Sequence, residues 1–337
     1  MKTREGDFIE TYEDSIFDVK GLVHPPNSII AFIRYLPDEK GERRKGAATY
    51  RKIYSLSKRY RVLKEKYPEY LVHDPIFDAT LCEVPVTNVK KYYRPVERLG
   101  ELRSSRASNE LEAQTLQLAE RLKEATSIPW NSIGISGSIL VGLQSGSSDI
   151  DLVVYGSENC RVVYSALRDF LKEKSDPFRS YNGEDLKGLF DFRSKDSAAD
   201  FKSFVRTESR KVMQGRFVGT DYFMRFVKDW DEVDENYGDV QYKNLGVARV
   251  RATIADDSDG IFTPCVYKVD KVHVQKGPKV GHVEEIGSFR GRFCEQARIG
   301  EVVIAQGKVE RVTDTRRGRE HYRVLLGNNP SDFMILA

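Results

Sequence analysis

The chain has 337 residues, of which 40% are hydrophobic and 31% are charged, and its formal net charge is +3. This length exceeds one ordinary hydrophobic core, so we expect two or three domains of a globular protein. No run of about 18 apolar residues occurs, which argues against a membrane span. The mildly basic balance permits a polyanionic partner without requiring one.

The N-terminus and the cysteines bear on the compartment. Residues 1–14 lack the apolar core of a secretory signal peptide. Cys82, Cys160, Cys265 and Cys294 are scattered, without a Cys-x-x-Cys pair. This usage argues against a zinc ribbon or a disulfide framework. It favours a reducing, cytoplasmic location.

Residues 1–100 are expected to form a small α+β module. Ile16–Val19 and Ser28–Tyr35 are rich in Ile, Phe and Val and read as strands, and Arg61–Lys66 looks helical. Tyr50–Tyr60 mixes Tyr with Arg and Lys. Such a mixture can contact bases and phosphates, although an ordinary surface with snorkelled cations has the same composition.

The second unit, residues 101–235, begins with a helix predicted over Asn109–Ala125. Asn109 and Glu112 have the spacing of a capping box, and leucines recur on one face. After a proline, Ile133–Ile135 reads as a short buried strand. The helix therefore leads directly into the segment that carries the candidate chemistry.

The segment Gly134–Gly156 reads GISGSILVGLQSGSSDIDLVVYG. Gly137 and Ser138 follow a strand and open a short helix, where free backbone N–H groups and a hydroxyl can bind a phosphate. Glycine at this point lets the phosphate approach the backbone without a Cβ in the way. Asp149 and Asp151 are two residues apart, so on a strand they share one face.

Two ionised carboxylates side by side repel each other unless a cation lies between them. Oxygen ligands of this kind suit Mg²⁺ or Mn²⁺, because such an ion keeps waters and shares its shell with substrate phosphates. Two ions can clamp the attacking and leaving oxygens of a phosphoryl displacement. Asp149 and Asp151 are therefore the candidate metal ligands. A lone Gly-Ser or a lone Asp-x-Asp would be a common surface feature, and the combination carries the inference.

Gly137-Ser138, followed after ten residues by Asp149-x-Asp151, resembles the signature of the DNA polymerase beta-like nucleotidyltransferase superfamily. The whole chain resembles archaeal predicted nucleotidyltransferases with extra N- and C-terminal regions. The resemblance implies a mixed sheet flanked by helices, bound metal, and transfer of a nucleoside monophosphate from a nucleoside triphosphate to an acceptor hydroxyl. It places Gly137, Ser138 and Ser148 among the nucleotide-binding residues.

The resemblance also implies a third carboxylate on a later strand. Helices are predicted over 157–174, 183–192 and 198–213, and a strand over 219–227. Asp221 alternates with Phe223 and Arg225 on one face of that strand, which makes Asp221 the choice for the third metal ligand. Arg225 is a candidate contact of the triphosphate. The rivals for the third carboxylate are Asp191 and Asp229.

Residues 236–337 change character. Five short alternating segments with turns between them predict a small all-β domain, either an OB-like barrel or a sandwich. Between residues 268 and 323 there are 13 Lys and Arg against eight Asp and Glu. The candidates for a nucleic-acid track with stacking aromatics are Arg290, Arg292, Lys308, Arg311, Arg316, Arg317, Arg319, Phe289, Phe293 and Tyr322.

The leading hypothesis is a metal-dependent nucleotidyltransferase with an α+β fold. RNA is one of the candidate acceptors. A second hypothesis is a non-catalytic nucleotide sensor that binds nucleic acid. A third is a structural or antitoxin-like partner protein. The sequence does not decide between the acceptors, the nucleotides or the oligomeric states.

Overall fold

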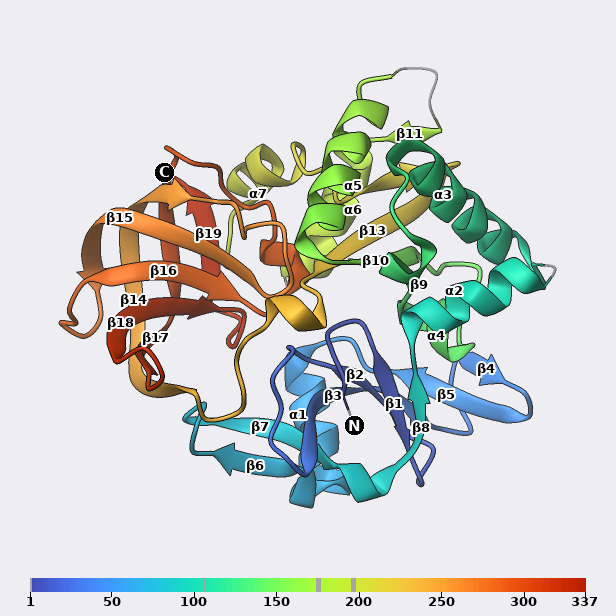
Figure 1. Ribbon diagram of the computed structural model, residues 1–337, viewed down its shortest axis with the longest axis horizontal. Helices are drawn as coiled ribbons and strands as arrows, with labels where there is room; N and C mark the ends of the chain where they lie inside the picture. Colours follow the sequence, from blue (N-terminus) through green and yellow to red (C-terminus); the bar gives the residue numbers. More distant parts are fainter. Residues whose placement is uncertain (1, 106, 174–176, 195–197) are drawn as a thin grey trace. The chain divides into compact units, whose positions relative to one another are not determined.

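The computed structural model describes residues 2–105, 107–173, 177–194 and 198–337 and has a mixed α+β fold (Figure 1). The chain divides into two compact units. The first unit contains residues 1–72, 81–180 and 212–233. The second contains residues 73–80, 181–211 and 234–337.

The first unit begins with an antiparallel sheet in which β4, β5, β3, β2, β1 and β8 follow one another, and β7 joins β3 to β6. The strands of this sheet are β1 (Phe8–Thr11), β2 (Ile16–Val19), β3 (Ser28–Pro37), β4 (Arg43–Lys45), β5 (Ala48–Lys52), β6 (Leu71–Asp74), β7 (Ala79–Pro85) and β8 (Val89–Tyr93). Residues 73–80, which span the end of β6 and the start of β7, are counted with the second unit. The strands expected over 16–19 and 28–35 are both present. The helical segment is longer than expected and forms α1 (Leu56–Lys66).

The second sheet of the first unit is mixed. Its order is β11-β12-β13-β10-β9, with β10 parallel to β13 and antiparallel to β9. The strands are β9 (Ile133–Ile135), β10 (Ile150–Tyr155), β11 (Phe178–Arg179), β12 (Gln214–Phe217) and β13 (Thr220–Val227). The helices of this part are α2 (Pro95–Ser104), α3 (Glu110–Thr126), α4 (Gly137–Val141) and α5 (Ser157–Phe170).

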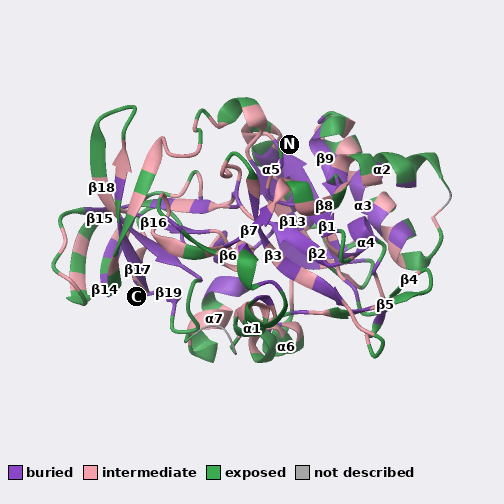
Figure 2. Ribbon diagram, turned by 90° about the horizontal axis from the view of Figure 1, so that it is seen from below, coloured by how far each residue is buried: buried purple, intermediate pink, exposed green. Residues whose placement is uncertain are grey.

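The N-terminal sheet shares a cluster of buried side chains with helix α4. Phe8, Ile16 and Tyr35 of the N-terminal sheet pack in one cluster with Leu140 and Val141 of α4. This packing removes apolar side chains of the N-terminal sheet and of α4 from water, and residues on both sides of position 100 belong to one compact unit. Buried residues follow the strands, and exposed residues gather on turns and outer helix faces (Figure 2).

The second unit contains a five-stranded barrel. The strands pair in the order β14-β15-β16-β18-β17, and β17 pairs back with β14 to close the ring, with β16 and β18 parallel. This connectivity is that of an OB-type barrel, as the spacing of the segments predicts. Its strands are β14 (Val240–Asp256), β15 (Cys265–Lys276), β16 (Val283–Ser288), β17 (Val302–Asp314), β18 (Arg319–Leu326) and the additional β19 (Phe333–Leu336).

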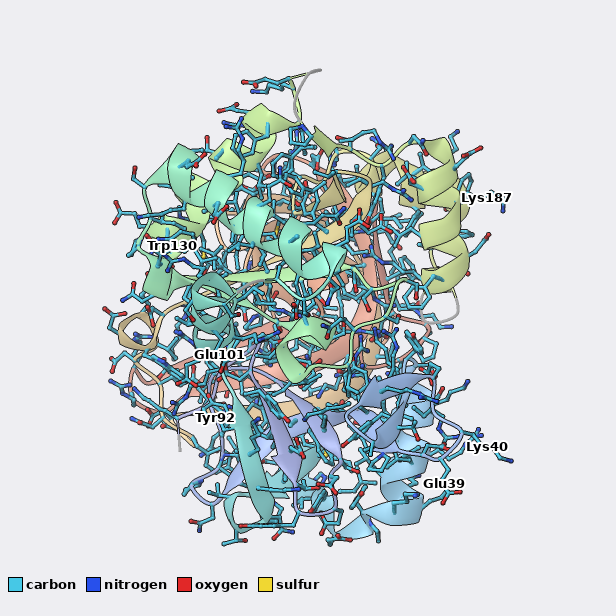
Figure 3. All side chains as sticks on the ribbon, turned by 90° about the vertical axis from the view of Figure 1, so that its right-hand side faces the viewer. Glu39, Lys40, Tyr92, Glu101, Trp130 and Lys187 are labelled. Carbon is cyan, nitrogen blue, oxygen red and sulfur yellow. The ribbon has the colours of Figure 1, made fainter. Side chains whose placement is uncertain are left out.

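Two helices, α6 (Gly183–Arg193) and α7 (Phe201–Glu208), also belong to the second unit. The helix expected over 198–213 is shorter, because α7 ends at Glu208 and Met213 already accepts a hydrogen bond from the Met224 amide of β13 at 2.7 Å. Gly215 fits in β12 because a Cβ would lie 2.7 Å from the carbonyl oxygen of Arg179. Lys187 on α6, like Lys40 in a turn of the first unit, projects outward (Figure 3).

Within the described residues, none of the helices combines the length and apolar character needed to cross a membrane. The four cysteines are buried, and each has a free thiol.

Candidate active site

A cavity of about 80 Å³ lies in the first unit, and its walls come from both sheets. Pockets that hold a whole small-molecule ligand span roughly 300 Å³ or more, so this one fits a phosphate group or a hydrated ion. Its charged lining consists of three carboxylates and three cations, namely Asp18, Asp149, Asp151, Arg34, Lys52 and Arg225.

The strand–turn–helix segment builds one wall of the cavity. β9 ends at Ile135, and α4 starts at Gly137, whose φ of +63° is accessible to glycine with little strain. A Cβ on Gly137 would lie 2.0 Å from Oδ2 of Asp151, so the backbone is pressed against that carboxylate. The helix has only five residues. Its dipole is therefore short, and the site depends on side-chain charges and close backbone approach.

Asp149 and Asp151 lie together, as predicted. Asp149 directly precedes β10 and Asp151 is its second residue, so both side chains point to the cavity face. Burial, followed by repulsion from Asp149, raises the pKa of Asp151 to about 7. Arg225, Lys52 and Arg34 oppose this shift. The paired carboxylates are thus held at an electrostatic cost that nearby positive charge reduces.

The N-terminal strands supply two of the cations. Arg34 is on β3 and Lys52 ends β5, and both line the cavity. Burial, followed by repulsion from Arg34, lowers the pKa of Lys52 to about 8. The sequence analysis did not predict Arg34 as a site residue, and it included Lys52 only as part of the Tyr50–Tyr60 segment. The available signal was a charge within a strand that is otherwise apolar, as in the SIIAFIRY segment.

A third carboxylate reaches the cavity from an unexpected strand. Asp18 lies on β2, is 8% exposed, and forms an ion pair of 2.8 Å with Lys20. Burial works against ionisation, but the charges of Lys20 and then Arg225 lower the pKa of Asp18. A carboxylate in the fully buried strand IFDV was the signal that could have identified it.

The two candidate serines have different surroundings. Ser138 is 2% exposed and lines the cavity, and its Oγ has no hydrogen-bond partner among the described residues. A buried hydroxyl in this state is costly unless a ligand or water completes it. Ser148 does not line the cavity. Its Oγ accepts hydrogen bonds from Arg43 Nη1 at 2.8 Å and from the Ser145 amide at 2.9 Å, which fixes the loop before Asp149.

The structure does not bring Asp221 into the cavity. Asp221 is exposed on β13 and forms an ion pair with Arg216 at 3.3 Å, whereas Arg225 on the same strand does line the cavity. The rivals are also engaged elsewhere. Asp191 pairs with Lys187 at 3.2 Å, and Asp229 pairs with Arg4 at 2.7 Å.

The donor set fits a magnesium ion that keeps water and substrate ligands. In the described ranges, no group of three His, Cys, Asp or Glu side chains is arranged to enclose a metal ion. Mg²⁺ needs only one or two protein carboxylates when substrate phosphates and waters complete its shell. Asp149 and Asp151 meet that requirement, because a cation would offset the repulsion that raises the pKa of Asp151.

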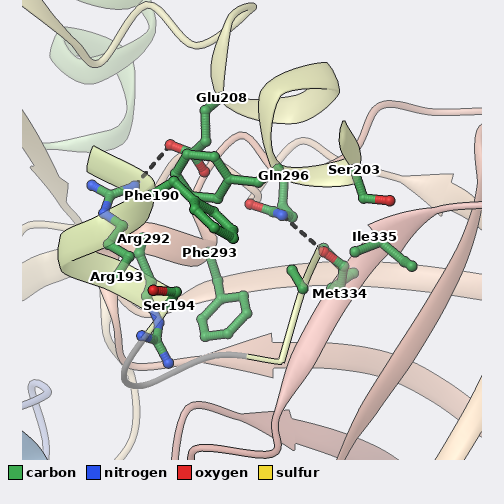
Figure 4. A pocket seen from close by; sticks show the side chains of 12 residues that line it. Phe190, Arg193, Ser194, Ser203, Glu208, Arg292, Phe293, Gln296, Met334 and Ile335 are labelled. Carbon is green, nitrogen blue, oxygen red and sulfur yellow. Dashed lines mark hydrogen bonds and ion pairs between the residues drawn. The ribbon is translucent and has the colours of Figure 1, made fainter. Parts of the chain in front are cut away.

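A smaller cavity of about 30 Å³ lies in the second unit between α6, α7 and β19 (Figure 4). Its aromatic lining includes Phe190 and Phe293, and its acidic residue Glu208 forms an ion pair of 2.7 Å with Arg193. The carboxylate of this cavity is already ion-paired, and much of the remaining lining is apolar. The catalytic candidates therefore remain those of the first unit.

The predicted basic track of the barrel is largely neutralised within the second unit. Lys308, Arg311, Arg316, Arg317 and Arg319 pair with Glu310, Glu320, Asp234, Asp314 and Glu284, respectively. Phe293 is buried and is not exposed for stacking. Exposed cations occur instead on the neighbouring strands β14 and β15, where Arg251 lies opposite His273 and Arg249 opposite Lys276.

The chain is similar over its whole length to an archaeal protein. It is 32% identical over 341 residues to "Uncharacterized protein MJ1086" of Methanocaldococcus jannaschii, covering 99% of this chain and 98% of the relative. No protein-family model matches the chain. No solved structure matches it.

Proposed function

The chain belongs to the family of the uncharacterized protein MJ1086 of Methanocaldococcus jannaschii, and we propose that it is a metal-dependent nucleotidyltransferase. The proposed reaction moves a nucleoside monophosphate from a triphosphate to an acceptor hydroxyl and releases pyrophosphate. The supporting observation is the cavity that combines Gly137, the unpartnered Ser138 hydroxyl, and the Asp149–Asp151 pair with three cations.

In the proposed site, Asp149 and Asp151 hold Mg²⁺ or Mn²⁺. When bound, the ion neutralises charge on the reacting phosphate oxygens. The Ser138 hydroxyl donates a hydrogen bond to a phosphate oxygen. Arg225 and Lys52 bind further oxygens of the triphosphate, since their charges already face the carboxylates across the cavity. A cavity of about 80 Å³ has no room for the ribose and base, which therefore lie outside it in the proposed complex.

The acceptor side needs a group that accepts a hydrogen bond from the attacking hydroxyl. Asp18 is the candidate that the cavity supports, and Asp221 is the candidate that the sequence pattern supports. Asp18 stays ionised through Lys20, which suits an acceptor of hydrogen bonds.

Asp18→Asn and Asp221→Asn separate the two candidates. We expect Asp18→Asn to lower the transfer rate about a hundredfold, the order expected when a positioned general base is lost. We expect Asp221→Asn to stay within about threefold of the wild type, because an exposed ion pair contributes little. Single-turnover transfer of labelled nucleotide measures both. The opposite ranking would restore Asp221 as the third carboxylate.

RNA is the acceptor class that we carry forward, with the exposed β14–β15 face as its proposed contact. Arg251 and Lys276 supply positive charge there, and phosphate contacts of this kind give salt-dependent affinity without base recognition. We also propose a cytoplasmic location, which four free, buried thiols support.

The direct test incubates the purified chain with each α-³²P-labelled triphosphate, Mg²⁺ or Mn²⁺, and separated RNA, protein and small-molecule fractions. We expect label to enter one fraction only when metal is present and to be lost with a chelator. Metal-dependent binding of nucleotide without transfer to any fraction would favour a nucleotide sensor. Neither binding nor transfer would contradict both functions.

A further inference from the structure

Arg225 is held by a residue at the very start of the described chain. It lies on β13 beside Val153 of β10, on the same strand face as Asp151, and its side chain is 19% exposed. Its Nη1 donates to Oε1 of Glu5 at 2.6 Å. The cation that faces the candidate metal ligands is therefore tied to a segment that precedes the first strand.

Glu5 is itself fixed from three directions. Its side chain is 0% exposed, and Oε2 accepts a hydrogen bond of 2.8 Å from the Gly21 amide. Oε1 accepts from Lys20 Nζ at 3.1 Å as well as from Arg225. Lys20 also pairs with Asp18, so Glu5 is connected to two cavity-lining residues. Charge-assisted bonds of this length are the stronger class of hydrogen bond in proteins.

Without the Glu5 contact, the guanidinium of Arg225 would be attracted to the carboxylates of Asp149 and Asp151. Arg225 already acts on the charge of Asp151, and a long side chain with several rotamers could fold onto the Asp149–Asp151 pair. That contact would occupy both the guanidinium that is proposed to bind phosphate and the carboxylates that are proposed to bind metal. Glu5 offers the guanidinium a competing carboxylate, which holds Nη1 of Arg225 away from that contact.

We propose that Glu5 is a positioning residue that holds Arg225 ready for the triphosphate, so that the N-terminal segment forms part of the nucleotide site. This proposal rests on the function proposed above. Glu5 need not touch substrate. It acts by fixing the donor geometry before the ligand arrives, which reduces the ordering cost of binding.

A double-mutant cycle tests the coupling. Glu5→Gln, Arg225→Met and the double variant are titrated calorimetrically with Mg²⁺ and triphosphate analogues whose α,β-bridging oxygen is an imido group. We expect each single change to weaken binding about tenfold, and the double variant to bind no more weakly than Arg225→Met alone. Two losses that multiply to about a hundredfold would overturn the proposal, because Glu5 would then act independently of Arg225.

Glu112→Gln is the matched control. Glu112 is also a buried glutamate of the first unit and pairs with an arginine, Arg98, at 2.7 Å, but neither residue lines the cavity. We expect it to lower the unfolding midpoint as Glu5→Gln does while leaving the affinity for the analogue unchanged. Equal losses of affinity in the two variants would reduce Glu5 to a stabilising residue and overturn the proposal.

Two further outcomes complete the design. If Glu5→Gln does not fold, Glu5→Asp keeps the charge but shortens its reach, and wild-type affinity in that variant would overturn the positioning role. If the wild-type protein binds none of the triphosphate analogues, the proposed function fails, and the inference fails with it. If the wild-type protein binds the analogue and Glu5→Gln binds it with the same affinity, only the inference about Glu5 is overturned.

Discussion

Asp149→Asn and Asp151→Asn are each expected to lower nucleotidyl transfer by about a thousandfold or more, because an amide binds Mg²⁺ far more weakly than a carboxylate. Both side chains face the cavity from the start of β10. Single-turnover transfer of an α-labelled triphosphate measures the loss. Wild-type transfer in either variant would contradict the metal assignment.

The same Asp151→Asn change is expected to stabilise the metal-free protein. The pKa of Asp151 is raised from 3.8 to about 7, so ionising it costs the folded state free energy. That cost is absent below pH 3.8, grows as the pH rises to about 7, and is complete above it. We therefore expect the variant to gain about 1–2 kcal/mol in unfolding free energy at pH 8, discounting for partial exposure of the group, and almost nothing at pH 4.

Denaturant unfolding in the presence of a chelator, at pH 4 and pH 8, measures this gain. Asp169→Asn is the control, since Asp169 is an exposed carboxylate that pairs with Lys172 on the surface of α5. It should leave transfer unchanged and should not gain stability at pH 8, because the hydrogen bond to Lys172 lowers the pKa of Asp169 instead of raising it. An Asp151→Asn variant less stable than the wild type at pH 8 would mean that the cavity cations already compensate the Asp151 charge fully.

Gly137→Ala is expected to abolish transfer and to lower the unfolding free energy by about 2 kcal/mol or more. An alanine Cβ would lie 2.0 Å from Oδ2 of Asp151, and the backbone φ of +63° adds strain for any residue with a Cβ. The carboxylate must therefore move out of its position beside Asp149. Transfer assays and denaturant unfolding measure the two effects.

Gly142→Ala is the control for this change. Gly142 ends α4 with a φ of +72°, but a Cβ there would meet no atom within 4 Å. The control therefore carries the cost of the left-handed conformation, about 1 kcal/mol, without the collision. We expect it to keep transfer activity. Equal losses in both variants would show that backbone strain, rather than displacement of Asp151, explains the effect.

Local patterns determined much of the fold. Asn109 caps α3 through the Glu112 amide, as its spacing predicts, and the strands over 16–19 and 133–135 have the expected bounds. The alternating segments after residue 236 form an OB-type barrel. These features depend on caps, turns and a two-residue period, which neighbouring residues fix within one element. The helix predicted over 198–213 is too long, because the hydrogen bond from the Met224 amide to the Met213 carbonyl ties the end of that segment to β13.

The sequence alone determined the motif: a strand, Gly137 at the turn, and two aspartates that the strand period puts on one face. The tertiary structure decided what surrounds it. Asp18, Arg34 and Lys52 come from strands about 100 residues earlier in the chain, and they reach the cavity only because the N-terminal sheet packs against α4 beside the aspartates. Side chains brought together by sheet packing leave no periodic signal, whereas alternation within a strand does. For the same reason, Asp221 has the right alternation but lies outside the cavity.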